Sequence, residues 1–291
     1  AMAAALQPTD AKDICDAVVD AASSGRRLEV VGGGSKRSVG RPGRETVKLS
    51  TANLAKVVDY DPAELILTIE PGARLSEIES LLSQHNQMLA FEPYDFAAVA
   101  GAAAGRSTIG GVVGAGLAGS RRVSAGGVRD HLLGFSAVNG RGQAFKAGGK
   151  VVKNVTGYDL SKVMAGSWGQ LAVLTELTFK VLPKPPVVRT LMLRGLAAET
   201  AVSAMTLAMG SQAEVAAAAH LPAAEGKDAV TAIRIEGFGP SVDARQRMLE
   251  KLLSETGQVD VLEAREADAH WAGVQYASHL SAVERPVLWR I

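Results

Sequence analysis

Apolar residues in the first part of the chain recur with two different periods. Between residues 9 and 24 they return every three to four positions, and Gly25 follows, which predicts an amphipathic helix whose buried face carries Ile14, Ala17, Val18 and Ala21. Short runs rich in β-branched residues predict strands at residues 27–31, 47–49, 57–60 and 64–70. The helical period returns at residues 75–85, so we expect a second helix there.

Strand patterns and one short helix continue up to a cluster of prolines. We expect a helix at residues 161–168, a hairpin turn at 140–142, and strands at 131–139, 143–146 and 171–181. Prolines then occupy positions 183, 185 and 186, and a strand cannot continue through them because proline has no N–H donor. This cluster predicts a boundary between a first domain, residues 1–183, and a second domain, residues 184–291.

The second predicted domain has a distinctive order of elements. Strand, helix, strand, strand, helix and strand are predicted in turn at residues 187–193, 198–209, 214–220, 229–237, 242–255 and 259–264. This order is typical of a ferredoxin-like fold, an antiparallel sheet with two helices on one face. A further helix is expected at residues 266–280. Because a strand pattern begins at residue 288, we expect the natural chain to continue beyond Ile291.

Two glycine-rich segments are the strongest chemical signal. Residues 106–130 carry few large side chains, a poor composition for a helix or a core, so we expect their backbone to lie against a large ligand. Residues 32–34 are glycines that follow a predicted strand and precede Ser35 and Lys36, which favours an anion-binding loop. An ordinary glycine turn explains that short segment equally well. It is not a P-loop, because the four-residue spacer and the final Gly-Lys-Ser/Thr are missing.

Other motifs are absent or occur in the wrong context. Residues 114–119 satisfy the dinucleotide pattern G-x-G-x-x-G, but no amphipathic helix follows, and Asn139 stands where an acidic residue should bind the ribose. The histidines show no HExxH or paired spacing. The single cysteine, Cys15, cannot supply an iron–sulfur cluster or a cysteine-rich zinc site, so no metal site is predicted.

Composition and charge narrow the class of partners. Of the 291 residues, 47% are hydrophobic and 21% are charged, which is ordinary for a soluble globular protein. A net charge of +1 gives no electrostatic reason to expect nucleic acid or a membrane surface. No apolar run is long enough to cross a bilayer. We therefore expect no transmembrane segment and a cytoplasmic protein, with any membrane association made through partner subunits.

Four segments in a fixed order carry a resemblance to a known family. They are residues 108–111 (TIGG), 126–134 (GGVRDHLLG), 157–160 (GYDL) and 166–176 (GSWGQLAVLTE). Together they resemble the flavin-binding domain of the vanillyl-alcohol oxidase superfamily, the p-cresol methylhydroxylase (PCMH) type. The resemblance implies an α+β fold, with a PCMH-type FAD-binding domain of two α+β subdomains followed by a ferredoxin-like α+β cap domain.

Within that family the chain is similar to the FAD-binding subunits of bacterial glycolate oxidases. This resemblance implies the oxidation of a small 2-hydroxy acid, glycolate, and two partners, a catalytic flavoprotein subunit and an iron–sulfur subunit. Two alternatives stay open. The first alternative is a self-contained FAD-dependent 2-hydroxy-acid dehydrogenase. The second is a non-catalytic scaffold subunit that retains the flavin fold.

The same resemblance implies which residues hold FAD. The loop around the pyrophosphate comprises Gly32, Gly33, Gly34, Ser35 and Lys36. The segment along the isoalloxazine and ribityl chain comprises Gly110, Gly111, Gly114, Ala115 and Gly126, and the adenosine half lies against Gly169 and Val173. Thr108 is a further cofactor-binding residue. Residues 30–44 contain no histidine that could attach a flavin, so the FAD is predicted to be non-covalent. In the second domain Arg290 is the only candidate for a substrate-binding, catalytic residue.

Overall fold

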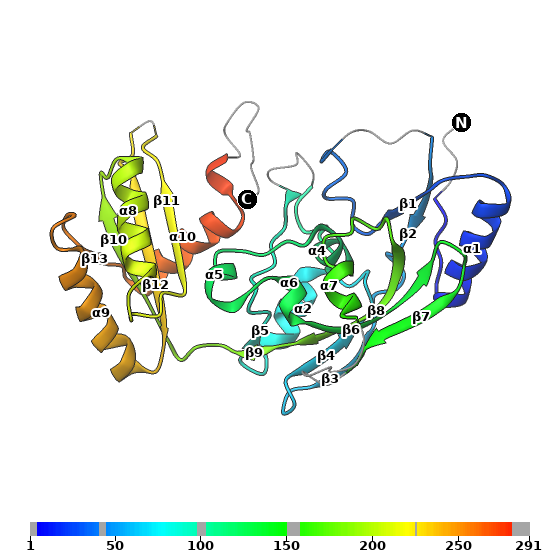
Figure 1. The fold of residues 1–291 in the computed structure, drawn as a ribbon, viewed down its shortest axis with the longest axis horizontal. Helices are drawn as coiled ribbons and strands as arrows, with labels where there is room; N and C mark the ends of the chain where they lie inside the picture. Colours follow the sequence, from blue (N-terminus) through cyan, green and yellow to red (C-terminus); the bar gives the residue numbers. More distant parts are fainter. Residues whose placement is uncertain (1–4, 41–44, 98–102, 150–157, 225, 281–291) are drawn as a thin grey trace. The chain divides into compact units, whose positions relative to one another are not determined.

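A computed structural model describes residues 5–40, 45–97, 103–149, 158–224 and 226–280. The chain divides into two compact units, each described here by itself. The first unit comprises Ala1–Ala118, Gly126–Pro183 and Leu280–Ile291, and the second comprises Gly119–Ala125 and Lys184–His279. Both contain helices and sheets (Figure 1), which confirms the predicted α+β class.

A five-stranded antiparallel sheet forms the centre of the first unit. Its order is β3-β4-β8-β6-β7, with β3 (Val57–Asp61), β4 (Ile66–Ile69), β8 (Ala172–Lys180), β6 (Leu132–Asn139) and β7 (Ala144–Gly148). Two strand pairs complete the unit. These are the parallel pair β1 (Leu28–Val31) and β2 (Val47–Ser50), and the antiparallel pair β5 (Gln87–Met88) and β9 (Leu182–Pro183).

Strand β8 is buried on both of its faces because each face meets a different apolar cluster. Leu177 and Phe179 pack in the larger cluster, which also contains residues of helices α2 (Leu75–Ser83) and α4 (Ile109–Ala115). Val173 packs in a smaller cluster with Ile14 of helix α1 (Ala11–Ser23) and Leu49 of β2. Two short helices, α6 (Val128–His131) and α7 (Leu160–Met164), precede β6 and β8 along the chain.

The second unit has the ferredoxin-like order that the sequence predicts. Its antiparallel sheet has the order β11-β12-β10-β13, with β10 (Val187–Arg194), β11 (Ala217–Leu221), β12 (Val230–Gly237) and β13 (Asp260–Val261). One face carries α8 (Ala198–Met209) and α9 (Gly239–Leu253), which pack on Ile233 and Ile235. The other face carries α10 (Ala264–Gln275), whose Trp271 packs on Ala232 (Figure 1). A short 3-10 helix follows (Ser278–Leu280).

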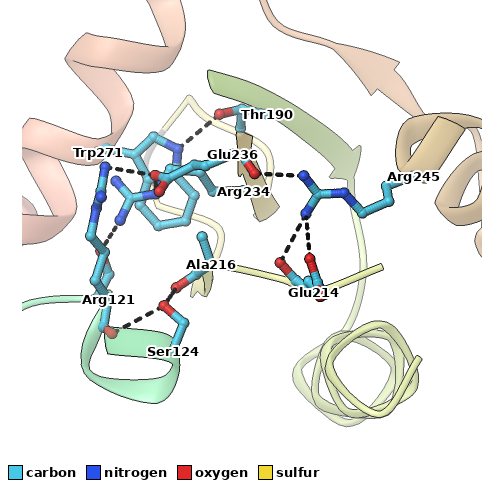
Figure 2. A network of polar contacts seen from close by, with 10 residues as sticks. Arg121, Ser124, Thr190, Glu214, Ala216, Arg234, Glu236, Arg245 and Trp271 are labelled. Atoms are coloured by element: carbon cyan, nitrogen blue, oxygen red, sulfur yellow. Dashed lines mark hydrogen bonds and ion pairs between the residues drawn. The ribbon is translucent and has the colours of Figure 1, made fainter. Parts of the chain in front are cut away.

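A buried charged cluster lies on the α10 face of that sheet (Figure 2). The Glu236 carboxylate forms ion pairs with Arg121, at 2.7 Å, and with Arg234, at 3.0 Å. The Arg234 guanidinium stacks on Trp271, 4.5 Å from the centre of its ring. Arg121 comes from the segment Gly119–Ala125, which ends in helix α5 (Arg122–Ala125), and Ser124 Oγ of that helix donates to Ala216 O at 2.8 Å. These bonds attach the segment to the second unit.

The main error of prediction concerns the glycine-rich residues 106–130, which we expected to be non-helical. They form α4, α5 and α6. Helix α4 is stable despite its glycines because Ile109, Val112, Val113 and Ala115 are buried, and burial outweighs poor intrinsic propensity. The predicted helix at residues 161–168 is shorter than expected and ends at Met164, because Ala165 is already extended and Gly166 takes positive φ. The predicted strand at residues 288–291 lies outside the described residues.

Candidate cofactor site

A cleft of about 670 Å³ lies in the first unit where three separate segments meet. One segment is β1 with the loop that follows it, the second is α4, and the third is the turn before β8. Its volume falls within the range of about 300–1,000 Å³ that is usual for ligand and cofactor pockets. Among the predicted residues that line it are Gly32, Gly33, Gly34, Ser35, Lys36, Thr108, Gly110, Gly111, Gly114, Ala115 and Gly169.

The loop after β1 presents unused hydrogen-bond donors to this cleft. Within the part of the chain that the structure describes, the backbone N–H groups of residues 33–36 donate to no protein acceptor. Gly34 takes a φ of +75°, which lets successive N–H groups turn toward one side. A row of such donors in a cleft is suited to bind an anion, because a group such as pyrophosphate accepts from several donors at once.

Lys36 adds a positive charge to the same loop. Its Nζ donates to Ser35 Oγ at 3.1 Å and lies 3.4 Å from Ser107 Oγ, and both acceptors are neutral. Burial lowers the pKa of Lys36 below its usual 10.5, and the more distant charge of Asp95 opposes this only in part. Since a buried ammonium is costly without a counter-charge, an anion in the cleft would stabilise the charged form.

The neighbouring arginine already has a partner. Arg37 Nε donates to Glu29 Oε1 at 2.8 Å, and Nη2 donates to Oε2 at 3.1 Å. This pairing with Arg37 holds the pKa of Glu29 below its usual value. The bidentate pair fixes the loop against β1, and it leaves Lys36 as the cation of the loop that can respond to a ligand.

The side chain of Thr108 caps the N-terminus of helix α4. Thr108 has extended backbone angles, and its hydroxyl accepts from Gly111 N at 3.3 Å. Gly110 lies against Pro71, because a Cβ at Gly110 would come within 2.6 Å of the proline Cβ. At Gly114 a Cβ would meet no protein atom nearer than Gly169 N, at 4.0 Å. Gly110 therefore serves packing within the unit, whereas Gly114 leaves open space beside the cleft.

Two glycines of the first loop are required because the chain that enters α4 passes directly against them. A Cβ at Gly32 would lie 2.3 Å from Thr108 Oγ1, and a Cβ at Gly33 would lie 1.4 Å from the backbone oxygen of Arg106. The loop and the segment that enters α4 therefore approach each other backbone to backbone. This contact brings two glycine-rich segments, more than 70 residues apart in sequence, to one cleft.

The third segment is a tight turn between α7 and β8. Trp168 N donates to Gly114 O at 2.8 Å, and Gly166 N donates to Val113 O at 2.9 Å, so the turn is fixed to the C-terminal end of α4. Trp168 lines the cleft and is 47% exposed. Sequence reasoning noted the glycines of this turn but did not place Trp168 in the site.

Two of the residues assigned to the site from the sequence do not line this cleft, and the position of a third is not described. Val173 faces the small apolar cluster of α1 and β2, because side chains alternate along β8 and its neighbours Ala172 and Leu174 take the cleft side. Gly126 is not among the lining residues; its φ is +84°, and a Cβ there would lie 2.8 Å from Asp130 Oδ2. Arg290 lies outside the described residues.

The residues present fit a dinucleotide that carries flat rings at both ends of a pyrophosphate. The unused N–H groups and Lys36 suit the pyrophosphate, while Gly111, Gly114 and Ala115 provide a side-chain-poor wall. Among the described residues, no group of three or more His, Cys, Asp or Glu side chains could hold a metal ion. Nor does any described helix combine the length and the apolar character that a membrane crossing requires.

Comparisons with known proteins agree with this geometry. The sequence model of a family described as "FAD binding domain" matches residues 2–148. Glycolate oxidase subunit GlcE of Escherichia coli is 42% identical over 172 residues, which cover 59% of this chain and 47% of that protein. D-lactate dehydrogenase of Archaeoglobus fulgidus is 30% identical over 154 residues, 53% of this chain and 32% of that protein. The chain thus spans less than half the length of these curated relatives.

Solved structures share the fold at low sequence identity. p-Cresol methylhydroxylase with substrate bound superposes with a TM-score of 0.72 at 15% identity, covering 95% of this chain and 63% of that one. Alkyldihydroxyacetonephosphate synthase superposes with a TM-score of 0.73 at 18% identity, covering 93% and 54%. These likenesses confirm the predicted PCMH-type fold.

Proposed function

The chain belongs to the FAD-binding domain family, and from that premise we propose that it is the FAD-binding subunit of a glycolate-oxidising complex. One observation carries the proposal. The loop of residues 32–36, helix α4 and the Trp168 turn converge on a single cleft with unused N–H donors and a lysine that no carboxylate neutralises within the described residues. The similarity to glycolate oxidase subunit GlcE supports the choice of glycolate among 2-hydroxy acids.

Bound FAD supplies the hydride acceptor for oxidising a 2-hydroxy acid. The chain's own residues bind and orient that cofactor. The N–H groups of residues 33–36 and the Lys36 ammonium hold the pyrophosphate, and the Arg37–Glu29 pair keeps the loop in place. Gly111 and Gly114 leave room for the cofactor to lie along α4. The cofactor is non-covalent in this proposal, because no histidine stands in residues 30–44.

The domains and partners follow from the same proposal. The proposal keeps the predicted division into an FAD-binding domain, residues 1–183, and a ferredoxin-like cap, residues 184–291, except that Gly119–Ala125 packs with the second unit. The partners are a catalytic flavoprotein subunit and an iron–sulfur subunit. Relatives include proteins named as two different glycolate oxidase subunits, GlcE and GlcD, which supports a complex of several chains. With Cys15 as its only cysteine, this chain cannot ligate an iron–sulfur cluster by itself, so a cluster would belong to another subunit.

An absorption spectrum of the purified chain with added FAD tests the proposal. The expected result is a retained yellow flavin after gel filtration that glycolate reduces only when the partner subunits are present. Reduction by glycolate without partners would instead identify a self-contained dehydrogenase. A chain that retains no FAD would identify a scaffold subunit and overturn the proposed role.

A further inference from the structure

We propose that Trp168 provides a stacking surface for one of the two fused heteroaromatic rings of FAD. The inference deepens the proposed function and rests on it. Adenine and isoalloxazine share the relevant chemistry, a flat π-system joined to the pyrophosphate through a sugar or ribityl chain. Trp168 lines the cleft and keeps 47% of its surface exposed, so part of a large aromatic side chain is accessible at the cleft.

The backbone at Trp168 is strained. Its φ is +54°, a left-handed conformation that bulky residues rarely adopt and that glycine or asparagine takes more easily. Gly169 follows with a φ of +70°. The bonds from Trp168 N to Gly114 O and from Gly166 N to Val113 O hold the turn in this shape. Strain of this kind persists where the surroundings impose it and is concentrated at ligand sites.

No polar or aromatic partner among the described residues explains the position of the indole ring. Within the described residues, Trp168 makes no side-chain hydrogen bond, ring contact or cation–π contact. Trp271 in the second unit shows the usual alternative, since it is only 6% exposed and its Nε1 donates to Thr190 Oγ1 at 2.9 Å. A folding role therefore accounts for Trp271, whereas Trp168 lines the cleft with a side chain that stays half exposed.

Helix α4 relates this ring to the proposed pyrophosphate loop. A Cβ at Gly111 would lie 3.6 Å from Lys36 Nζ, and Gly114 O accepts from Trp168 N, so the two features flank one stretch of the helix. Three residues of α-helix span about 4.5 Å along the axis. The loop and the Trp168 turn therefore meet α4 within less than one helical turn of each other, so one extended ligand can contact both.

Two substitutions and three ligands test the inference. Trp168→Asn removes the ring and tolerates positive φ, and Trp168→Phe keeps a smaller ring. Isothermal titration with FAD, ADP and FMN should show that Trp168→Asn binds FAD about tenfold more weakly or worse, because stacking contributes roughly 1–3 kcal/mol per base. Trp168→Phe should recover most of that loss. The melting temperature of ligand-free Trp168→Asn should equal or exceed that of the wild type, because the strain is relieved.

The three ligands distinguish which ring of FAD contacts Trp168. A loss confined to FAD and ADP assigns the ring to adenine, and a loss confined to FAD and FMN assigns it to isoalloxazine; both support the inference. Equal affinities of wild type and Trp168→Asn for all three ligands would overturn it and leave the proposed function intact. A wild-type chain that binds no FAD would overturn both.

Discussion

Gly33 and Gly114 line the same cleft, but different neighbours explain why each is a glycine. A Cβ at Gly33 would overlap the backbone oxygen of Arg106, at 1.4 Å, whereas a Cβ at Gly114 would meet no protein atom within 4.0 Å other than Gly169 N at that limit. The sequence suggested access for a ligand along residues 106–130, and either an anion-binding loop or an ordinary turn at residues 32–34. The structure separates those that allow two chain segments to pack from those that leave space for a cofactor.

This difference predicts opposite effects of two alanine substitutions. Gly33→Ala should destabilise the ligand-free protein by about 3 kcal/mol or more, because a backbone clash cannot be relieved by a side-chain rotation. Gly114→Ala should stabilise it by about 0.5–1 kcal/mol, since alanine is the better helix former in α4, and should weaken FAD binding roughly tenfold. Urea unfolding and FAD titration measure the two quantities. Equal stability losses in both variants would contradict this division.

Lys36 should influence stability and FAD affinity in opposite directions. Burial lowers its pKa in the folded state below the unfolded value of about 10.5, so the folded protein binds fewer protons. Without ligand, its charge therefore destabilises the fold below the lowered pKa, and stability is regained as the pH rises toward 10.5. Lys36→Met should keep or raise the melting temperature of the ligand-free protein. It should also weaken FAD binding by about tenfold to a hundredfold, because a charge-assisted hydrogen bond is lost.

The pH dependence of FAD binding gives an independent check on Lys36. Wild-type affinity should fall as the pH rises through the lowered pKa of Lys36, because the anion binds to the protonated form. Lys36→Met should lose this dependence. Lys12→Met is a matched control, since Lys12 is a surface lysine on α1 with an 81% exposed side chain, and its removal should leave FAD affinity unchanged. If FAD affinity depended on pH in the same way in the wild type and in Lys36→Met, another group would be responsible for the titration.

At the scale of single elements, amphipathic patterns were predicted well and context-dependent helices were not. The helix predicted at residues 75–85 is α2 (Leu75–Ser83), because its apolar spacing determines which face is buried. Helix α4 was missed because Gly110, Gly111 and Gly114 have poor helix propensity, and only its burial in the core compensates. Trp168 was missed because no local pattern marks a positive φ at a tryptophan.

The cap of α4 is therefore expected to be important for its stability. Thr108→Ala removes the hydroxyl that accepts from Gly111 N and should destabilise the first unit by about 1 kcal/mol. Thr108→Ser keeps the hydroxyl and serves as the control, with a much smaller expected effect. The midpoint of urea unfolding distinguishes them. Should the serine variant be as unstable as the alanine variant, the loss would come from packing of the threonine methyl group, since Thr108 is buried.

At the scale of the whole molecule, one segment packs with a unit that its place in the sequence does not indicate. The sequence predicts a single boundary at the prolines after residue 182, but Gly119–Ala125 packs with the second unit although both of its flanks belong to the first. A buried ion pair from Arg121 to Glu236, 115 positions later, holds it there. Such long-range pairing cannot be read from hydrophobic periodicity, which reports only which face of an element is buried.

The same cluster allows a test of how a shared counter-charge stabilises the second unit. Glu236 faces two arginines whose side chains are only 11% and 5% exposed, so Glu236→Gln would leave two buried guanidinium groups without their carboxylate. We expect a loss of about 3 kcal/mol in the free energy of unfolding.

Glu214→Gln is the matched control for that substitution. Glu214 also pairs with a buried arginine, Arg245, at 3.6 Å, but its own side chain is 83% exposed, so the expected loss is below about 1 kcal/mol. Fluorescence of Trp271 during urea unfolding, recorded with Trp168 and Trp289 both replaced by phenylalanine, reports on the cluster because Arg234 stacks on that ring. Both acids pair with buried arginines, but only Glu236 is itself buried. Equal losses in the two variants would therefore show that burial of the acid does not determine how much such a pair stabilises the unit.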